Sequence, residues 1–353
     1  MDHGVLEASE SNPSKPERRG FLRRVRDIIG HLQALDLAAL PGLIKEFEAS
    51  QRRVDAALTN PRPAALEPVS PRELRTLRRF QLENRCRALA NAVYLGERTA
   101  LCRILGYYKF YIDTADIGFG SHVLLEGYWE IWLTMFFIRH LRPGMTVIDV
   151  GANFGYYSIL FGALVEASGH VYAVEPNPAV ATKLRRSIDL NGFTSRTTIV
   201  EAAAGPVDKA EVILYAPHGE PKNAAIVELP DLVSPELGTI YRVPQVRLDE
   251  VAAEAPRIDF VKIDAEGAEE GIIAGMRGIL IRDRPGLILE FNVARYRDPS
   301  SFLDQLEAIF RHMHYIDYSG AAVSITASQV ISERPGEDWL LYFDQPPSSV
   351  APK

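Results

Sequence analysis

From about Phe110 onward, short runs of β-branched and aliphatic residues alternate with segments of helical periodicity, and this alternation strongly restricts the fold. Apolar runs of this length are typical of buried strands, and the helices between them allow neighbouring strands to run parallel. The pattern predicts an α/β protein with a doubly wound, mostly parallel sheet. We expect strands at residues 146–150, 170–175, 197–203, 211–216, 258–264, 286–292, 315–319 and 339–343, and helices at 128–140, 156–166, 178–191, 269–279 and 300–312.

The first hundred residues follow a different pattern. Residues 1–17 are polar, with several charges and prolines, and we expect a disordered tail there. Apolar residues then recur at intervals of three and four, with an interruption at the proline-rich residues 60–71, so residues 18–105 are predicted to form a helical N-terminal region. The α/β domain is accordingly expected to occupy residues 106–353.

Composition excludes several classes of protein. A net charge of −7 disfavours general binding to nucleic acid, whose phosphates require a cationic face. The two cysteines have no ligand-like spacing, which indicates a reduced, cytoplasmic protein without a zinc site. The most apolar stretch, residues 131–138, is shorter than the roughly 20 residues of a membrane span, and no secretory signal is present, so we expect no transmembrane segment.

A turn containing two glycines follows the strand expected at residues 146–150. The segment reads VIDVGANFGYYS and leads directly into the helix expected at 156–166. Gly151 and Gly155 allow backbone conformations and close approaches that a Cβ atom prevents. Free N–H groups at the start of the helix would face a ligand beyond the carboxyl end of the strand. The segment therefore predicts a ligand-binding turn around Asn153.

An acidic residue stands at the end of the next strand. Glu175 follows Gly151 by 24 residues, and a carboxylate at this place can accept both hydroxyl groups of a ribose. The turn and the acid together indicate an adenosine-containing cofactor. Asp149 adds negative charge beside the turn, which disfavours a pyrophosphate and suits the cationic amino-acid end of S-adenosylmethionine. The spacing also departs from the GxGxxG pattern of dinucleotide sites, so S-adenosylmethionine is the predicted cofactor.

Several motifs occur in order along the chain: DVGANFGYYS, VEPNP, VKIDAEGAEEGIIAGM and ILEFN. Together they resemble the FkbM-type methyltransferases over roughly residues 125–343. The resemblance implies a class I methyltransferase (Rossmann-like) fold with a mostly parallel, seven-stranded sheet, here preceded by the N-terminal α-helical extension, which the resemblance does not cover. It also implies transfer of a methyl group from S-adenosylmethionine to a hydroxyl group of a sugar or natural product.

The resemblance implies roles for individual positions. Asp149, Gly151, Asn153 and Gly155 would form the loop that binds the methionine part of the cofactor. The further cofactor contacts that it implies are Tyr156 in the following helix, Glu175 at the ribose, Asn177 and Ala202 at the adenine, and Glu130 closing over the cofactor.

Methyl transfer to a hydroxyl group requires alignment of the acceptor oxygen and a group that removes its proton. Asp264 ends a buried strand and Glu266 follows it, so these two residues are the predicted catalytic groups. Glu290 and Asn292 end the next strand and are predicted to bind the acceptor, with mutual capping of the strand end as the alternative. No metal is predicted, because these acids lie on two strands without a defined ligand geometry.

The acceptor is expected to be a sugar, a glycan or a related small molecule. Residues 107–129 are rich in aromatic side chains, which either stack on sugar rings or pack at the domain junction. His312 and His314 are closely spaced and are an alternative source of the base. Two other functions stay open: an NAD-dependent oxidoreductase, and a non-catalytic protein that binds partners or a second copy of itself through its N-terminal helices.

Overall fold

The computed structural model describes residues 67–219, 223–227, 234, 236–334 and 336–344. These residues belong to one compact unit, Glu67–Lys353. The tail predicted for residues 1–17 and the helical segments predicted before residue 67 lie outside the described residues. Where the structure describes the chain, no helix is both long enough and apolar enough to cross a membrane.

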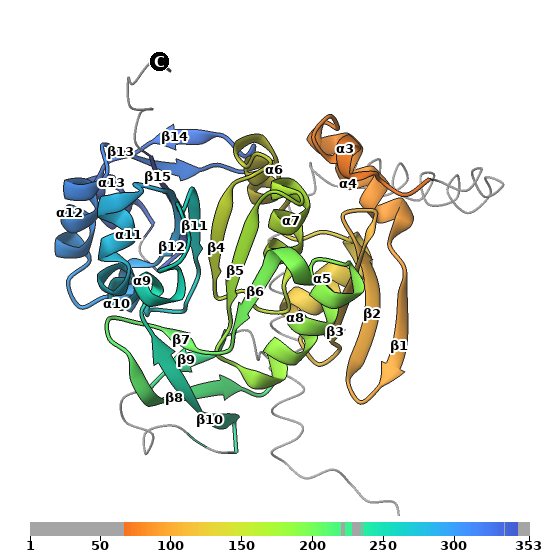
Figure 1. Cartoon of the computed structure of the whole chain (residues 1–353), viewed down its shortest axis with the longest axis horizontal. Helices are drawn as coiled ribbons and strands as arrows, with labels where there is room; N and C mark the ends of the chain where they lie inside the picture. The colour runs from red at the N-terminus through yellow and green to blue at the C-terminus, as the bar shows by residue number, and fades with distance from the viewer. Residues whose placement is uncertain (1–66, 220–222, 228–233, 235, 335, 345–353) are drawn as a thin grey trace, which may run out of the picture. The chain divides into compact units, whose positions relative to one another are not determined.

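A central sheet of eight strands organises this unit (Figure 1). The strands lie in the order β14-β13-β15-β12-β11-β4-β5-β6. The five strands from β12 to β6 run parallel, whereas β15 is antiparallel to both of its neighbours. Their bounds are β4 (Thr146–Val150), β5 (His170–Val174), β6 (Thr197–Val200), β11 (Phe260–Ile263), β12 (Gly286–Phe291), β13 (His312–Ile316), β14 (Ala322–Ser324) and β15 (Trp339–Asp344).

The chain builds this sheet outward from its middle in two directions. It runs from β4 to β5 and β6 on one side, and later from β11 to β12 on the other side of β4. The loops that leave β4 and β11 therefore diverge, which opens a crevice at the carboxyl ends of these strands. The predicted doubly wound class I methyltransferase fold is confirmed, with β14 as an eighth strand at the edge.

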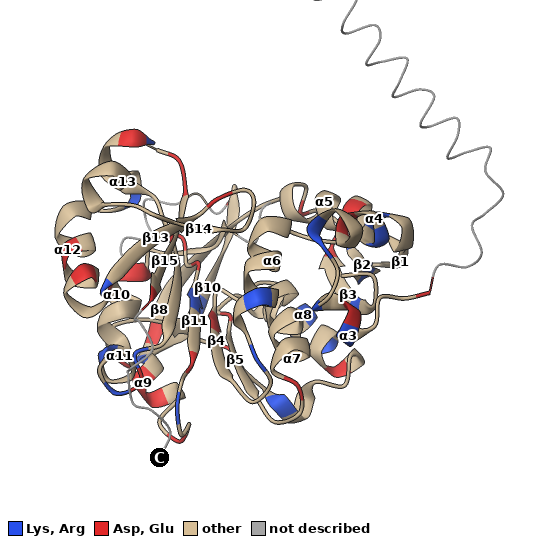
Figure 2. Ribbon diagram, turned by 90° about the horizontal axis from the view of Figure 1, so that it is seen from above, with Lys and Arg blue, Asp and Glu red and all other residues tan. Residues whose placement is uncertain are grey.

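Helices cover both faces of the central sheet (Figure 2). Because both faces are covered, β4 and β11 are buried along their whole length, as their continuous apolar runs predict. On one face lie α6 (Ile131–His140), α7 (Tyr156–Val165) and α8 (Pro178–Leu190); on the other lie α9 (Leu248–Val251), α10 (Glu269–Gly275), α11 (Arg277–Arg282), α12 (Pro299–Ile309) and α13 (Ala327–Glu333).

A second sheet is inserted in the chain between β6 and β11. Its strands β7 (Ala203–Ala204), β8 (Lys209–Pro217), β9 (Ala225–Ile226) and β10 (Gly238–Val246) lie in the order β7-β10-β8-β9. The strand expected at 211–216 belongs to this sheet, and the one expected at 197–203 is divided between the two sheets. The C-terminal half of β8 buries alternate residues, Leu214 and Ala216, as a sheet with one solvated face requires.

The helical prediction fails beyond residue 90. After α3 (Pro71–Leu74) and α4 (Arg79–Leu89), the chain forms the antiparallel strands β1 (Ala92–Gly96), β2 (Thr99–Ile104) and β3 (Tyr108–Asp113), and then α5 (Gly118–Glu126). In β2, Ala100, Cys102 and Ile104 are buried and the residues between them are not. This period of two is that of a strand, and the prediction of a helix overlooked it.

The small antiparallel sheet packs against the helices of the α/β unit. The outer edge of β3 is held by α8, because the N–H of Tyr111 donates to Ser187 Oγ (3.0 Å) and the N–H of Lys109 donates to Asn191 Oδ1 (3.0 Å). Leu82 on α4 is fully buried. Residues 67–105 therefore share a core with the domain that was predicted to begin at residue 106.

Candidate active site

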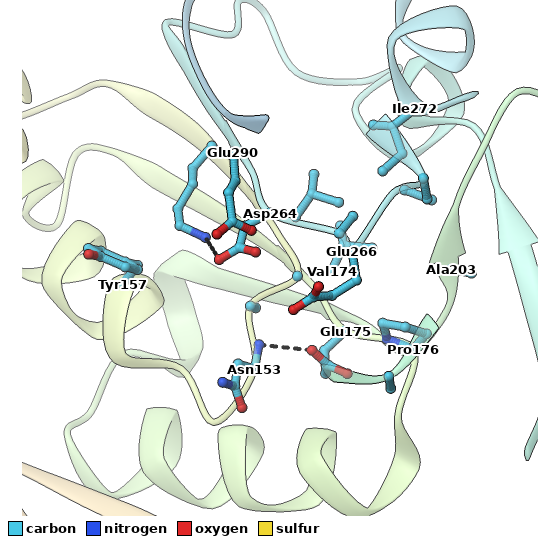
Figure 3. Close-up of a pocket in the computed structure, with 18 of the residues that line it drawn as sticks. Asn153, Tyr157, Val174, Glu175, Pro176, Ala203, Asp264, Glu266, Ile272 and Glu290 are labelled. Atoms are coloured by element: carbon cyan, nitrogen blue, oxygen red, sulfur yellow. Dashed lines mark hydrogen bonds and ion pairs between the residues drawn. The ribbon is translucent and has the colours of Figure 1, made fainter. Parts of the chain in front are cut away.

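A pocket opens at the carboxyl ends of β4, β5 and β11 (Figure 3). It encloses about 1100 Å³ of space free of atoms, part of which is open to solvent. The fold brings eight of the predicted site residues to its lining: Glu130, Gly151, Asn153, Tyr156, Glu175, Asp264, Glu266 and Glu290.

The turn after β4 forms the floor of the pocket. Gly151 has a φ of +71° and touches the neighbouring strand end, where a Cβ atom would lie 1.8 Å from the carbonyl oxygen of Asp264. Only glycine permits this approach. Asn153 also has a positive φ, +54°, and its backbone N–H donates to the carboxylate of Glu175 at 2.8 Å. The turn and the end of β5 are thereby locked together.

Glu175 is fixed by two backbone groups. Its two carboxylate oxygens accept the N–H groups of Asn153 and Asn177, each at 2.8 Å. Burial raises the pKa of Glu175 to about 7, although both hydrogen bonds oppose this shift. A carboxylate held in this way keeps lone pairs for further donors, such as the hydroxyl groups of a ribose.

Small and apolar side chains line the pocket beyond Glu175. They are Ala203 and Ala204 of β7, Leu214 of β8, Ala224, and Ile226 of β9. The inserted sheet therefore supplies an apolar wall that suits a flat ring such as adenine. Ala202 was predicted for this contact, but it is not part of the lining. Its neighbour Ala203 lines the pocket instead, because the chain leaves β6 at Val200 and turns into β7.

Asp149, Gly155 and Asn177 support the pocket from outside its lining, whereas direct contacts to the cofactor were predicted. Asp149 is fully buried in β4, where it accepts a hydrogen bond from Ser158 Oγ (2.6 Å). Asn177 caps α8 by accepting the N–H of Ala179 at 3.1 Å. Gly155 begins α7 with a φ of +99°. These residues position the binding turn and its neighbouring helices.

Three carboxylates meet where β11 and β12 end. Oxygens of Asp264, Glu266 and Glu290 lie within 4.8 Å of one another. Two cationic side chains contact them: Lys262 Nζ is 3.2 Å from Asp264, and the guanidinium group of Arg295 is 3.0 Å from Glu266 and 3.3 Å from Glu290. Such a donor set has the chemistry of a divalent-metal site, but here protein cations already contact each carboxylate.

The carboxyl groups of Asp264 and Glu290 lie next to each other (Figure 3), close enough to affect each other's ionisation. Burial and the charge of Asp264 raise the pKa of Glu290 to about 10. Burial also opposes ionisation of Asp264, but the ammonium group of Lys262 outweighs it and holds the pKa of Asp264 below its usual range. The two pKa shifts have opposite directions, so ionisation is favoured at Asp264 and disfavoured at Glu290.

Lys262 links this pair to the other side of the pocket. Its Nζ lies 3.9 Å from the buried Asp149 and 5.1 Å from the centre of the Tyr157 ring. Burial disfavours the charged amine, but Asp264 and Asp149 raise the pKa of Lys262 to about 12. The hydroxyl of Tyr157 in turn donates to Glu130 at 2.7 Å. One buried cation thus connects β4, β11 and the start of α7.

Three residues with a strained backbone line this pocket. Glu130, Asn153 and Glu266 all have positive φ values, of 35°, 54° and 53°, and all three line it. Non-glycine residues rarely adopt this conformation, and those that do gather at functional sites.

The aromatic segment at 107–129 is divided between two roles. Phe119 and Trp129 line the pocket, with ring centres 5.0 Å apart, whereas Tyr108 and Phe110 are buried in the core. Arg295, which contacts two of the three carboxylates, was missed by the sequence analysis. The feature of the sequence that could have indicated Arg295 is a cationic residue placed shortly after the strand end that carries Glu290.

Asn292 is not among the residues that line the pocket, and acceptor binding by it stays a prediction. Its Nδ2 donates to Asp338 Oδ1 (2.8 Å) and to the carbonyl oxygen of Gly336 (3.2 Å), so it ties the end of β12 to the segment before β15. The alternative of mutual capping with Glu290 is not what these contacts show, because the partners of Asn292 lie before β15. His312 and His314, on β13, also lie outside the lining.

Comparison with known proteins identifies the family. Residues 149–316 match the methyltransferase FkbM domain. This chain carries an FkbM methyltransferase domain. It is similar to the 31-O-demethyl-FK506 methyltransferase FkbM of Streptomyces tacrolimicus, with 27% identity over 220 residues, which cover 52% of this chain and 78% of that protein.

Other relatives match over shorter segments. A protein-L-isoaspartate O-methyltransferase of Aeropyrum pernix is 37% identical over 89 residues, 25% of this chain and 33% of that protein. The chain thus spans about a third of the length of such relatives. The crystal structure of methyltransferase FkbM from Methylobacillus flagellatus has a TM-score of 0.35 and 17% identity, and the match covers 60% of this chain and 53% of that one.

The methyl donor of an FkbM domain is S-adenosylmethionine, and the pocket fits it. The backbone of Gly151 lies open to the pocket, Glu175 retains lone pairs for a ribose, and the inserted sheet supplies an apolar wall. Among the described residues of the lining, Lys262 is the only Lys or Arg, and Asp264 already pairs with it. A pyrophosphate would therefore meet carboxylates, which argues against the dinucleotide alternative.

Proposed function

We propose that the protein transfers a methyl group from S-adenosylmethionine to a hydroxyl group of a sugar, a glycan or a related small polyol. The observation that carries the proposal is the pair of neighbouring carboxyl groups of Asp264 and Glu290, whose pKa values shift in opposite directions, beside the Gly151 turn and Glu175. It combines an ionised carboxylate, a protonated carboxyl group and a cofactor-type floor in one pocket.

The chain's own residues would hold the cofactor in three places. The turn at Gly151 and Asn153 takes the amino-acid end, and Glu175 accepts the ribose hydroxyl groups. The apolar wall covers the adenine; it consists of Ala203, Ala204, Leu214, Ala224 and Ile226. When bound, S-adenosylmethionine supplies an electrophilic methyl group. The walls of the pocket align the acceptor oxygen and shield the methyl group from water in this proposal.

Asp264 accepts the proton of the acceptor hydroxyl group in this proposal. Lys262, 3.2 Å away, keeps Asp264 ionised, and the protonated Glu290 donates a hydrogen bond that orients it. Arg295 positions Glu290 and Glu266 from outside the pocket lining. General bases of this kind contribute about 10²- to 10⁴-fold in rate.

The rim of the pocket supports a ring-shaped acceptor. Phe119 and Trp129 offer aromatic faces of the kind that stack on sugar rings, and Glu266 offers hydrogen bonds to further hydroxyl groups. The relative from Streptomyces tacrolimicus is named for methylation at an oxygen, which agrees with a hydroxyl acceptor. We also place the reaction in the cytoplasm, because Cys86 and Cys102 are free and buried.

The test compares cofactor binding with methyl transfer in three variants. We expect Asp264→Asn to bind S-adenosylhomocysteine within about threefold of the parent while methyl transfer to sugar and polyol acceptors falls at least about 10²-fold. Glu290→Gln should lose less methyl-transfer activity than Asp264→Asn, because the glutamine amide retains a hydrogen-bond donor. Asp338→Asn is the matched control, because Asp338 contacts the same Arg295 from outside the pocket lining.

Two outcomes would contradict the proposal. If Asp264→Asn abolishes binding of S-adenosylhomocysteine with the fold intact, Asp264 is a cofactor contact and not the base. If the parent protein methylates an isoaspartyl peptide and no hydroxyl compound, the acceptor group is a carboxylate.

A further inference from the structure

A second groove lies at the far end of α6 from the active-site pocket. It encloses about 1310 Å³ of space free of atoms, including open solvent. We call it the arginine groove. Its lining consists of Arg75, Leu77, Arg78 and Arg79 between α3 and the start of α4, of Met135, Ile138, Arg139, Arg142 and Pro143 on α6 and after it, and of Glu166 after α7.

The arginine groove is separate from the site of methyl transfer. The active-site pocket includes Glu130, immediately before α6, whereas the groove includes Arg139 and Arg142 at the other end of this helix. A helix of ten residues is about 15 Å long. Figure 1 shows α3 and α6 near one end of the central strands and the inserted sheet at the other end. A chemical group bound in the groove is therefore not the group that receives the methyl group.

Positive charge exceeds negative charge in the groove, whose lining holds five arginines and one carboxylate, Glu166. Of its five arginines, Arg79 pairs with Glu83 at 2.9 Å, but no carboxylate of the described chain lies within ion-pair distance of the other four. Burial lowers the pKa of Arg75; the carboxylate of Glu166 opposes this shift, and the charge of Arg142 adds to it. In a protein with a net charge of −7, such a cluster is unfavourable unless an anion joins it.

Backbone carbonyl groups hold several of these side chains in place. Arg75 donates to the carbonyl oxygens of Leu141 (2.9 Å) and Leu164, at the ends of α6 and α7. Arg139 donates to that of Gly320 at 3.0 Å. Guanidinium groups fixed in this way lose little conformational entropy when a ligand binds. Arg78 and Arg142 are exposed at the rim.

We propose that the arginine groove binds a phosphate or diphosphate group. Five guanidinium groups beside one carboxylate, Glu166, match a compact, multiply charged oxyanion better than a single carboxylate, and the guanidinium fork fits phosphate oxygens in pairs. The apolar part of the lining, Leu77, Met135 and Ile138, would contact the remainder of the ligand. The phosphate belongs either to a soluble molecule or to a lipid headgroup.

The experiment titrates the full chain with sodium pyrophosphate, sodium phosphate and sodium chloride at equal ionic strength. We expect saturable binding of pyrophosphate, and at least tenfold weaker binding by the double variant Arg78→Gln/Arg142→Gln. The matched control is Arg185→Gln/Arg242→Gln, which removes two surface arginines that pair with Glu201 and Glu211 elsewhere. This control should bind pyrophosphate like the parent protein.

A folding control accompanies the titration. Without added anion, the thermal midpoint of Arg78→Gln/Arg142→Gln should equal or exceed that of the parent, because repulsion is relieved. The proposal is overturned if pyrophosphate binds no better than chloride, or if the double variant binds it as well as the parent does. It is also overturned if polyglutamate binds more tightly than pyrophosphate through the same arginines, since the groove then takes an acidic peptide.

A second arm identifies the source of the phosphate. Vesicles of phosphatidylcholine with and without phosphatidic acid are sedimented with the parent and with both double variants. Sedimentation that requires phosphatidic acid, Arg78 and Arg142 assigns the groove to a lipid headgroup. Binding of pyrophosphate without such sedimentation assigns it to a soluble phosphorylated ligand. Both results support the proposal that the arginine groove binds a phosphate or diphosphate group.

Discussion

At the scale of single residues, two features require glycine at position 151: its positive φ and its close approach to the backbone of Asp264. We predict that Gly151→Ala lowers the free energy of unfolding by about 2 kcal/mol or more and abolishes binding of S-adenosylhomocysteine, because the new Cβ atom would lie 1.8 Å from a backbone oxygen. Urea denaturation and calorimetric titration measure the two effects.

Gly192 provides the control for this substitution. It has the same φ, +71°, but a Cβ atom there meets nothing within 4 Å. Gly192→Ala should therefore cost only the strain of the left-handed conformation, about 1 kcal/mol, and leave binding unchanged. Equal losses in both variants would show that the close approach to Asp264 is unimportant.

The raised pKa of Glu175 predicts that cofactor binding depends on pH. Its ionised form is the one that accepts two ribose hydroxyl groups, and its pKa of about 7 means that the carboxyl group is largely protonated at pH 6. Affinity for S-adenosylhomocysteine should therefore fall about tenfold between pH 8 and pH 6. The variant Glu175→Gln should not show this fall in affinity between pH 8 and pH 6. A titration series that gives parallel pH profiles for both proteins would refute the assignment.

Burial and pairing explain why some residue roles were predictable from the sequence and others were not. Asp264 and Glu290 each follow an apolar run, so their place at the strand ends was visible. The opposite shifts of their pKa values were not visible, because these depend on Lys262 and on a contact between two strands. Asn292 shows the reverse case, since the same strand-end pattern serves a structural link to Asp338.

At the scale of elements, α8 stabilises the outer edge of β3. Ser187 is fully buried and accepts the N–H of Tyr111. Ser187→Ala leaves this donor without a partner, so we predict a loss of about 1–3 kcal/mol in the free energy of unfolding, measured by urea denaturation. Thr182→Ala, at an exposed position of the same helix, should change it by less than about 0.5 kcal/mol. A similar loss in both variants would instead indicate a general effect on the helix.

Sequence patterns predicted the elements unequally. The strands β4, β5, β11 and β12 were recognised because continuous apolar runs fill strands that are buried on both faces. The strands β1 to β3 were not recognised, since β1 is largely exposed and β2 follows a helical segment without a proline between them. The inserted sheet was seen only in part, because β10 contains Pro244, which argues against a strand.

At the scale of the whole molecule, the boundary of the folded domain can be tested by truncation. We predict that residues 67–353 alone unfold cooperatively and bind S-adenosylhomocysteine, whereas residues 106–353 do neither. The shorter chain lacks Val69, Leu74, Leu82 and Cys86, which are buried in the core of the same compact unit. Thermal unfolding and calorimetric titration compare the two. Normal behaviour of residues 106–353 would restore the boundary that the sequence predicted.

The sequence by itself determined the doubly wound fold, the glycine turn and the acid at Glu175. These features are local, since the periodicity of apolar residues and the spacing of one turn and one acid carry them. Only the tertiary structure decided which residues line the pocket, how Lys262 and Arg295 set the charge of three carboxylates, and that five arginines share one groove. These depend on contacts between segments far apart in the chain, and no pattern along the chain encodes the distance between two such side chains.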